Sequence, residues 1–188
     1  MNVQFQKAVQ QTARLTEEEL GRFYAKCEEK MYPKGTFILD KGEVCNTLHF
    51  LLEGAVIQYQ LNEYEEEIVY DLSVPNDWVL NQTSFVERKP SENYMRAFET
   101  VRVLSLTIHD LHDLIAESQN YLQLGKIVYS PASQNALFEK FKTPDERYLH
   151  LLQDKPVLLQ MFPLKTIASY LGISPETLSR VRKRIKRS

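Results

Sequence analysis

Residues 162–187 read Phe-Pro-Leu-Lys-Thr-Ile-Ala-Ser-Tyr-Leu-Gly-Ile-Ser-Pro-Glu-Thr-Leu-Ser-Arg-Val-Arg-Lys-Arg-Ile-Lys-Arg, a pattern typical of two helices joined by a tight turn. Apolar residues recur at helical spacing up to Leu171, and Gly172 is the residue type that ends a helix in the left-handed conformation. A second helix is predicted to begin at Ser174-Pro175-Glu176, because a capping hydroxyl, a proline and an acid favour a helix start. Ala168 and Gly172 are small enough to let the two helices approach closely.

The second predicted helix has two different faces. Leu178, Val181 and Ile185 lie on one stripe at helical spacing. The opposite stripe carries only polar and charged side chains: Glu176, Ser179, Arg180 and Lys183. This polar face is available to a binding partner, although an ordinary surface helix pair has the same local pattern.

Positive and negative charges are distributed unevenly along the sequence. Residues 165–188 carry seven Lys or Arg and one acid, which leaves 16 bases and 24 acids for residues 1–164. The formal net charge of −2 for the whole chain hides this division. A basic end on an acidic protein is the electrostatic pattern expected when one end contacts a phosphate backbone, so the charge favours DNA binding by the helix pair.

Composition excludes several classes of protein. The chain has 188 residues and 43% hydrophobic content, which is ample for a buried core. We expect a cytoplasmic protein with no membrane partner, because no apolar run is long enough to span a bilayer and residues 1–15 lack a signal-peptide core. Two cysteines, Cys27 and Cys45, are too few for a four-thiolate cluster. We therefore predict no metal, no cofactor and no catalytic residues.

The first half of the chain has the pattern of an antiparallel β-roll. Short apolar or alternating runs are separated by turn residues, at 36–39, 47–52, 55–61, 67–72, 94–98 and 101–106. A helix is predicted over residues 15–26, where Thr16 and Glu19 have capping-box spacing. Ser84 to Glu87 is predicted to form a short helical turn between two strands, a place where a ligand pocket can open.

After residue 106 the hydrophobic period becomes helical. The segment from His109 to Val128 is apolar on more than one stripe, with a break or kink expected at Pro131. Two arrangements satisfy the extra apolar face: pairing with the same helix of a second subunit, or packing onto the roll of the same chain. Thr143-Pro144-Asp145-Glu146 then starts a C-terminal helical domain. The predicted fold is α+β, with a jelly-roll-like β-roll over 1–108, a long connecting dimerisation helix over 109–142 and a helix-turn-helix domain over 143–188.

This order of elements resembles the Crp/Fnr superfamily of bacterial transcription regulators over nearly the whole chain. The residues that carry the resemblance are Lys41-Gly42-Glu43, Leu52-Glu53-Gly54, Asp77-Trp78 and Ile167-Ala168 through Arg180. The resemblance implies a cyclic-nucleotide-binding-type domain, a homodimer and a second helix that enters the major groove of double-stranded DNA at an inverted-repeat operator. The DNA-contacting residues implied are Pro175, Glu176, Thr177, Ser179, Arg180, Lys183 and Arg184, with Arg182, Lys186 and Arg187 as further phosphate contacts.

The predicted nucleotide pocket departs from the family pattern. Members that bind cyclic nucleotide carry Phe-Gly-Glu-Leu, whose Glu holds the ribose, and Arg-Ser/Thr-Ala, whose Arg pairs with the phosphate. Here the corresponding residues are Val79-Leu80-Asn81-Gln82 and Ser91-Glu92-Asn93. A buried phosphodiester without a cation is costly, so we predict that cyclic AMP is not the effector.

The effector and the class of protein have alternatives. An unknown small molecule near Trp78, Asn81 and Arg96 is one prediction, and a regulator of the same fold without any ligand is another. A cupin-like metal enzyme with a helical appendage is a third reading, but only His49 lies among the predicted strands and no His-x-His pair occurs.

Overall fold

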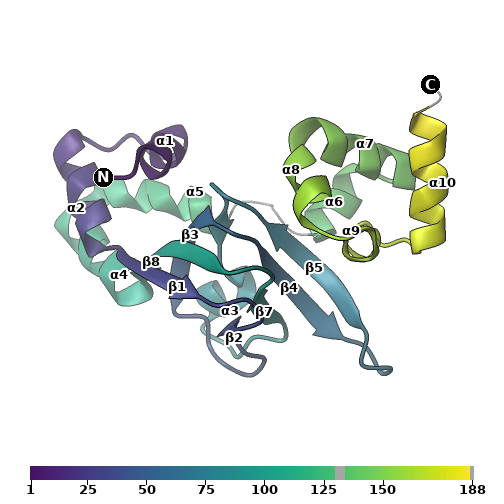
Figure 1. Cartoon of the computed structure of the whole chain (residues 1–188). Coiled ribbons are helices and arrows are strands. Elements are labelled where there is room, and N and C mark those ends of the chain that lie inside the picture. Colours follow the sequence, from purple (N-terminus) through teal and green to yellow (C-terminus); the bar gives the residue numbers. More distant parts are fainter. Residues whose placement is uncertain (130–133, 187–188) are drawn as a thin grey trace. The chain divides into compact units, whose positions relative to one another are not determined.

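The computed structural model describes residues 1–129 and 134–186, which form two compact units. Unit 1 comprises Met1–Val56 and Pro75–Ser130, and unit 2 comprises Ile57–Val74 and Pro131–Ser188. The units do not follow the chain in consecutive blocks, because a hairpin from the first half groups with the C-terminal helices (Figure 1). The functional boundaries at 108/109 and 142/143 stay a prediction.

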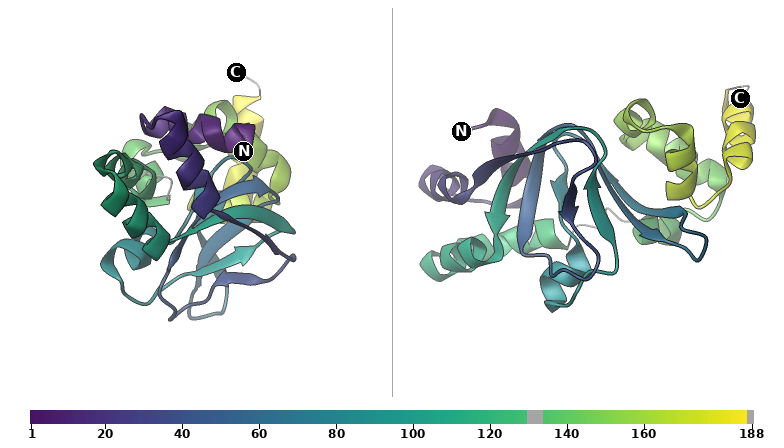
Figure 2. Two further views of the ribbon diagram at one scale, coloured as in Figure 1. Left: turned by 90° about the vertical axis from the view of Figure 1, so that its left-hand side faces the viewer. Right: turned by 60° about the horizontal axis from the view of Figure 1, so that its bottom comes forward.

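Unit 1 is built on an antiparallel sheet with the strand order β1-β8-β3-β6. Its strands are β1 (Glu28–Tyr32), β3 (Thr47–Glu53), β6 (Trp78–Val79) and β8 (Val101–Thr107). β2 (Phe37–Leu39) pairs with β7 (Tyr94–Ala97) in the same unit. The helices are α1 (Val3–Thr12), α2 (Glu17–Lys26), α3 (Gln82–Glu87), α4 (Ile108–Glu117) and α5 (Gly125–Val128), and α1, α2 and α4 lie on one side of the strands (Figure 2).

An aromatic cluster joins the N-terminal helices to this sheet. Phe5 of α1 lies 5.5 Å from Phe50 of β3 and 5.7 Å from Trp78 of β6, measured between ring centroids. Phe23 of α2 stacks on Trp78 with an interplanar angle of 7°. Aromatic pairs of this kind add about 0.5–1.5 kcal/mol each beyond their buried area. The first 26 residues are therefore an integral part of the unit 1 core.

The connecting segment differs from the single long helix that the sequence predicts. α4 ends at Glu117, a 3₁₀ helix η1 spans Gln119–Leu124, and α5 follows at Gly125–Val128. The apolar residues of this segment pack into the core of unit 1: Ile108, Leu111, Leu114, Tyr121, Leu124, Ile127 and Val128. The sequence left two arrangements open for the extra apolar face of this segment. In the structure these apolar residues are buried by packing within the same chain.

The break after Glu117 has a specific cause in α2. Ser118 is extended (φ −152°, ψ 130°), and its hydroxyl donates to the Glu19 carboxylate at 2.8 Å. The same carboxylate accepts from the Asn120 side chain at 2.9 Å, and the Tyr121 hydroxyl donates to the Glu19 carbonyl at 2.8 Å. The pKa of Glu19 is lowered to about 2, first by the hydrogen bond from the Thr16 backbone N–H and then by the bonds from the Asn120 and Ser118 side chains. An ionised Glu19 thus holds the turn that ends α4.

His49 lies fully inside unit 1 and is held neutral. Its ring nitrogens share hydrogen bonds with the Thr47 hydroxyl at 2.9 Å and the Ser105 hydroxyl at 2.8 Å. Burial, and to a smaller extent the charge of Lys30, lowers its pKa to about 4. With both ring nitrogens engaged in the strands, His49 is not placed to bind a metal ion.

The buried His49 predicts an acid-sensitive stability. The unfolded chain takes up a proton at this residue as the pH falls below 6.5, whereas the folded chain does not until about pH 4. The stability that the neutral His49 contributes to the folded chain is therefore complete above pH 6.5. It is lost between pH 6.5 and 4, by up to about 3 kcal/mol. We expect His49→Gln to flatten this part of the stability profile, measured by urea unfolding at pH 7, 6 and 5. An unchanged slope in the variant would assign the acid sensitivity to other groups.

Among its described residues, unit 2 combines a β-hairpin with five helices. The hairpin consists of β4 (Val56–Leu61) and β5 (Glu67–Ser73), which are hydrogen-bonded neighbours. The helices are α6 (Gln134–Lys140), α7 (Pro144–Asp154), α8 (Pro156–Met161), α9 (Leu164–Tyr170) and α10 (Pro175–Ile185). Ser169 of α9 is bonded to the β5 backbone: its hydroxyl accepts from the Val69 N–H at 3.0 Å and donates to the Glu67 carbonyl at 3.3 Å. The hairpin and α9 are therefore directly linked.

The fold class is confirmed as α+β, an antiparallel β-roll followed by several helices. All six strands expected from the sequence occur, together with β1 and β6, which were not predicted. Within the described residues, every helix is too short or too polar to cross a bilayer.

Candidate nucleic-acid interface

The turn between α9 and α10 has the geometry that the sequence predicts. The Ile173 N–H donates to the Ala168 carbonyl and the Gly172 N–H to the Ser169 carbonyl, both at 3.0 Å, which is the bonding of a Schellman motif. Gly172 has a φ of +67°, as this motif requires. Ser174 then caps α10 by accepting from the Thr177 N–H at 3.2 Å, and Pro175 occupies the first helical position.

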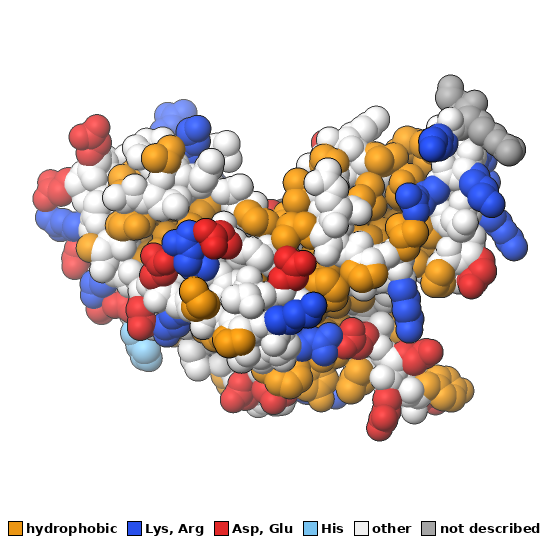
Figure 3. All heavy atoms as spheres, in the orientation of Figure 1, with side chains coloured by type: hydrophobic (Ala, Val, Ile, Leu, Met, Phe, Trp, Pro, Cys, Tyr) orange, Lys and Arg blue, Asp and Glu red, His pale blue; other side chains and the backbone are white. Residues whose placement is uncertain are grey.

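α10 presents its polar face to solvent. Leu178 and Val181 are each only 1% exposed, so they attach the helix to unit 2. The residues predicted to contact DNA lie outside: Pro175, Glu176, Ser179, Arg180, Lys183 and Arg184 are exposed and Thr177 is partly buried. Figure 3 shows the Lys and Arg side chains gathered along this end of the molecule. The separation into an apolar and a polar stripe is confirmed.

The side chains at the start of α10 suit hydrogen bonding to a polar ligand. The pKa of Glu176 is lowered, first by a hydrogen bond from its own backbone N–H, then by Ser174 and by the charge of Arg180. Glu176 is thus an ionised acceptor one helical turn before the cationic donor Arg180. A carboxylate and a guanidinium at this spacing can accept from one base edge and donate to another.

Arg184 has a structural partner inside unit 2. Its guanidinium donates to the Asp145 carboxylate of α7 through Nε at 3.0 Å and through a second bond from Nη2. This bidentate pair holds the end of α10 against α7. A phosphate contact by Arg184 must therefore share or replace this bond. Arg187, another predicted phosphate contact, lies outside the described residues.

Arg147 supports the turn and was missed by the sequence analysis. It donates to the carbonyl of Leu171, the last residue before the turn, at 3.0 Å, and to the Phe141 carbonyl at 3.0 Å. Its guanidinium also lies 3.9 Å from the centroid of the Phe138 ring of α6. Because Phe138 in turn packs under Gly172, Arg147 connects α6, α7 and the turn. An arginine in the middle of α7 carries no sequence signal for this role.

The three residues of the predicted ligand pocket have separate structural roles in unit 1. Trp78 belongs to the aromatic cluster, and the Asn81 side chain caps α3 by accepting from the Ser84 N–H at 3.0 Å. Arg96 lies on β7 opposite Phe37 of β2. These contacts do not unite the three side chains in one site, and their ligand role stays a prediction.

The positions that hold a cyclic nucleotide in the resembled family are engaged in local hydrogen bonds. The Ser91 hydroxyl donates to the Asn93 carbonyl at 2.7 Å and accepts from the Asn93 N–H at 3.1 Å, and both residues are buried. Arg88 is directed to the backbone, donating to the Cys45 carbonyl at 2.8 Å and the Phe85 carbonyl at 3.3 Å. Asn81, Ser91 and Asn93 thus bring no guanidinium for a phosphate, and the Arg88 guanidinium is already bonded to the Cys45 and Phe85 carbonyls and to the Asn46 side chain.

Comparisons with known proteins give a match to one domain family and to one fold. Residues 29–118 match the cyclic nucleotide-binding domain family. A comparison with curated proteins found no significant match.

Solved structures with the same fold extend over most of the chain. The catabolite activator protein of Thermus thermophilus is 19% identical over 92% of this chain and 84% of its own, with a TM-score of 0.56. The c-di-GMP responsive global regulator CLP of Xanthomonas campestris is 19% identical over 92% of both chains, with a TM-score of 0.59. FixK2 of Bradyrhizobium japonicum is 18% identical over 86% of this chain and 85% of its own, with a TM-score of 0.60. The chain therefore has the fold of Crp/Fnr-type transcription regulators.

Proposed function

We propose that the chain is a homodimeric, sequence-specific DNA-binding transcription regulator of the Crp/Fnr type that acts in the cytoplasm and is not an enzyme. The observation that carries the proposal is the exposed polar face of α10 behind a capped turn, in a fold shared with regulators. The concentration of basic residues at this end of an acidic chain supports the same conclusion.

The residues of α10 divide into two kinds of contact in this proposal. Arg180 donates two hydrogen bonds to a guanine edge, and Glu176 accepts from a cytosine amino group. Thr177 and Ser179 make shorter contacts beside them, and Pro175 contributes only van der Waals contact. Lys183 and Arg184 bind phosphates, which raises affinity with little sequence discrimination.

A dimer places two α10 helices in successive major grooves, about 34 Å apart, so the operator is expected to be an inverted repeat. The segment over 108–128 does not supply the expected free apolar stripe, because its apolar residues are largely buried in unit 1. Within this segment Leu122 is 59% exposed, and Tyr129, directly after it, is 63% exposed. DNase footprinting on operators selected from random DNA tests the arrangement. Protection of a single unrepeated half-site would contradict the dimer.

Cyclic AMP is not expected to bind this protein. Asn81 caps α3, Ser91 bonds to Asn93, and Arg88 bonds to backbone carbonyls, so binding would leave the phosphate without a cation. Isothermal titration calorimetry with millimolar cyclic AMP should show no saturable heat, and the thermal midpoint should not change. Saturable binding with thermal stabilisation would show that Arg88 or another cation rearranges to meet the ligand. A regulator that has no ligand, or one that binds another small molecule, gives the same negative result.

A further inference from the structure

A groove with an apolar floor and a basic rim lies between α7 and α10 in unit 2. Its volume is about 480 Å³. Its apolar lining residues, here called the floor, are Tyr148, Leu152 and Ile185, and its polar lining residues, here called the rim, are Ser179, Arg182, Lys183 and Lys186. Leu152 is 38% exposed, so part of the floor is open to solvent. The groove therefore has an uncovered apolar surface next to three cations.

The rim has no acidic partner within the described residues. No acid lines the groove there, and Arg182, Lys183 and Lys186 form no ion pair among the described residues. The neighbouring acid of α7, Asp145, is already bonded to Arg184. Like charges on one rim repel one another and favour an anionic occupant. A ligand that suits the groove thus has an apolar group flanked by acids.

The hairpin tip of this same chain, defined as residues 63–66, has that chemistry. It reads Glu63-Tyr64-Glu65-Glu66, and Tyr64 is 75% exposed, the largest exposure of any large hydrophobic side chain in the described chain. The conformation of the tip is fixed, because the Asn62 side chain accepts from the N–H groups of Tyr64 and Glu66, both at 2.9 Å. A preformed tip loses little conformational entropy when it binds.

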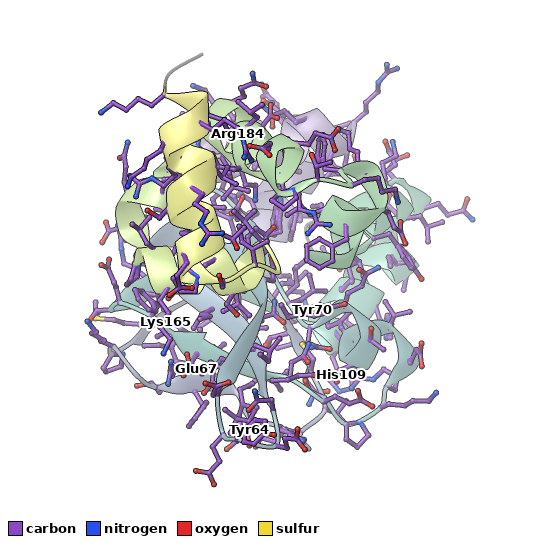
Figure 4. All side chains as sticks on the ribbon, turned by 90° about the vertical axis from the view of Figure 1, so that its right-hand side faces the viewer. Tyr64, Glu67, Tyr70, His109, Lys165 and Arg184 are labelled. Atoms are coloured by element: carbon purple, nitrogen blue, oxygen red, sulfur yellow. The ribbon has the colours of Figure 1, made fainter. Side chains whose placement is uncertain are left out.

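The tip does not reach the groove of its own chain. Figure 4 shows Tyr64 at the far end of the hairpin, away from Arg184 at the end of α10. Both elements belong to unit 2, so the separation is a property of one compact unit. A tyrosine flanked by three acids and a groove bordered by three cations are complementary only between two molecules.

We propose that the groove between α7 and α10 binds the hairpin tip of a second copy of this chain. Tyr64 enters the apolar floor, and the acids of the tip pair with Arg182, Lys183 and Lys186. The contact joins two different surfaces, so it builds a reciprocal pair, a ring or an open chain according to its geometry. The proposal does not depend on DNA binding, because neither partner surface requires DNA to form.

The first test maps the contact directly on the full-length protein. Tyr64 is replaced by the photoreactive residue p-benzoylphenylalanine, and this chain is mixed with an isotopically heavy copy that carries the native tyrosine. After irradiation, mass spectrometry should find light–heavy cross-links from position 64 to peptides of α7 and α10. Raising the salt concentration from about 0.05 to 0.5 M should weaken them, because the ion pairs are exposed. Intermolecular cross-links to another surface, or none, would overturn the proposal.

The second test reverses the charges on each side. The tip variant E63K/E65K/E66K makes both surfaces basic, and the groove variant R182E/K183E/K186E makes both acidic. Each variant alone should lose the cross-link about tenfold or more, because like charges then meet. An equimolar mixture of the two should restore it, since the basic tip faces the acidic groove and the acidic tip faces the basic groove.

The mixture also controls for damage to the fold. Two misfolded variants would not restore a specific contact, and circular dichroism checks each one separately. Cross-links that persist in either single variant, or that fail to return in the mixture of folded variants, would overturn the proposal. If the groove instead binds only an added acidic amphipathic peptide, the occupant is a foreign partner and the proposal is wrong. All these readouts are free of DNA, so they are independent of the proposed regulatory function.

Discussion

Replacing Arg180 by alanine is expected to lower affinity for the selected operator by about 1–3 kcal/mol for each guanine that the arginine side chain reads. Affinity for random DNA should change much less, because the non-specific complex relies on phosphate contacts. The physical basis is the exposed position of Arg180 on the polar face of α10, next to the ionised Glu176. Fluorescence anisotropy with operator and random duplexes at one fixed salt concentration measures both affinities.

Lys183→Ala is the matched control for Arg180→Ala. Lys183 is exposed on the same face, but a lysine ammonium is better suited to phosphate than to bidentate base recognition. We expect this variant to weaken operator and random DNA binding equally and to reduce the slope of log K against log salt by about 1. An equal decrease in affinity for both DNAs in Arg180→Ala would show that Arg180 binds phosphate and that another residue reads the sequence.

Gly172→Ala is expected to destabilise unit 2 by about 2–4 kcal/mol. The φ of +67° is unfavourable for any residue with a Cβ. In addition, a Cβ at this position would lie 2.4 Å from Cζ of Phe138, whose ring is fixed under Arg147. Urea unfolding followed by circular dichroism reports the helices of unit 2, whereas the single tryptophan, Trp78, reports unit 1.

Two further variants separate the causes of this effect. Gly21→Ala, in α2, has no atom within 4 Å of the new Cβ and should stabilise the chain by up to about 1 kcal/mol. Phe138→Ala combined with Gly172→Ala removes the steric clash but not the backbone strain, so the double variant should cost less than the sum of the single changes. A Gly172→Ala protein as stable as the native chain would mean that the turn rearranges without difficulty.

Local patterns in the sequence predicted most of the fold. Strands bounded by turn residues, the helix starts at Thr16 and Thr143, and the Gly172 turn all depend on residues close together in the chain. The connecting segment could not be predicted in the same way. Its helix ends at Glu117 because Ser118 and Asn120 bond to Glu19, a residue about a hundred positions earlier. Helical periodicity does not contain that information.

The candidate site was likewise predictable from the sequence only in part. The exposed face of α10 follows from its amphipathic pattern, so the exposure of residues such as Arg180 could be predicted from sequence. The tertiary roles of arginines did not follow: Arg184 is bonded to Asp145, and Arg147 donates to Leu171 across 24 residues. Likewise, the stacking of Trp78 on Phe23 of an N-terminal helix did not follow from the sequence, and the predicted ligand role of Trp78 stays a prediction. The sequence alone does not distinguish a charged or aromatic side chain that binds a ligand from one that holds two helices together.

The grouping of the β4–β5 hairpin with the C-terminal helices has a consequence for dissecting the protein. Unit 2 consists of two separate stretches of chain, Ile57–Val74 and Pro131–Ser188, so the backbone passes between the units three times. A single proteolytic cut between Val74 and α6 divides unit 2 itself, leaving β5 on the N-terminal fragment. The C-terminal fragment then lacks the strand to which Ser169 of α9 is bonded. DNA binding by the helices of unit 2 should therefore be assayed on the full chain, with the roll attached, and not on an excised C-terminal fragment.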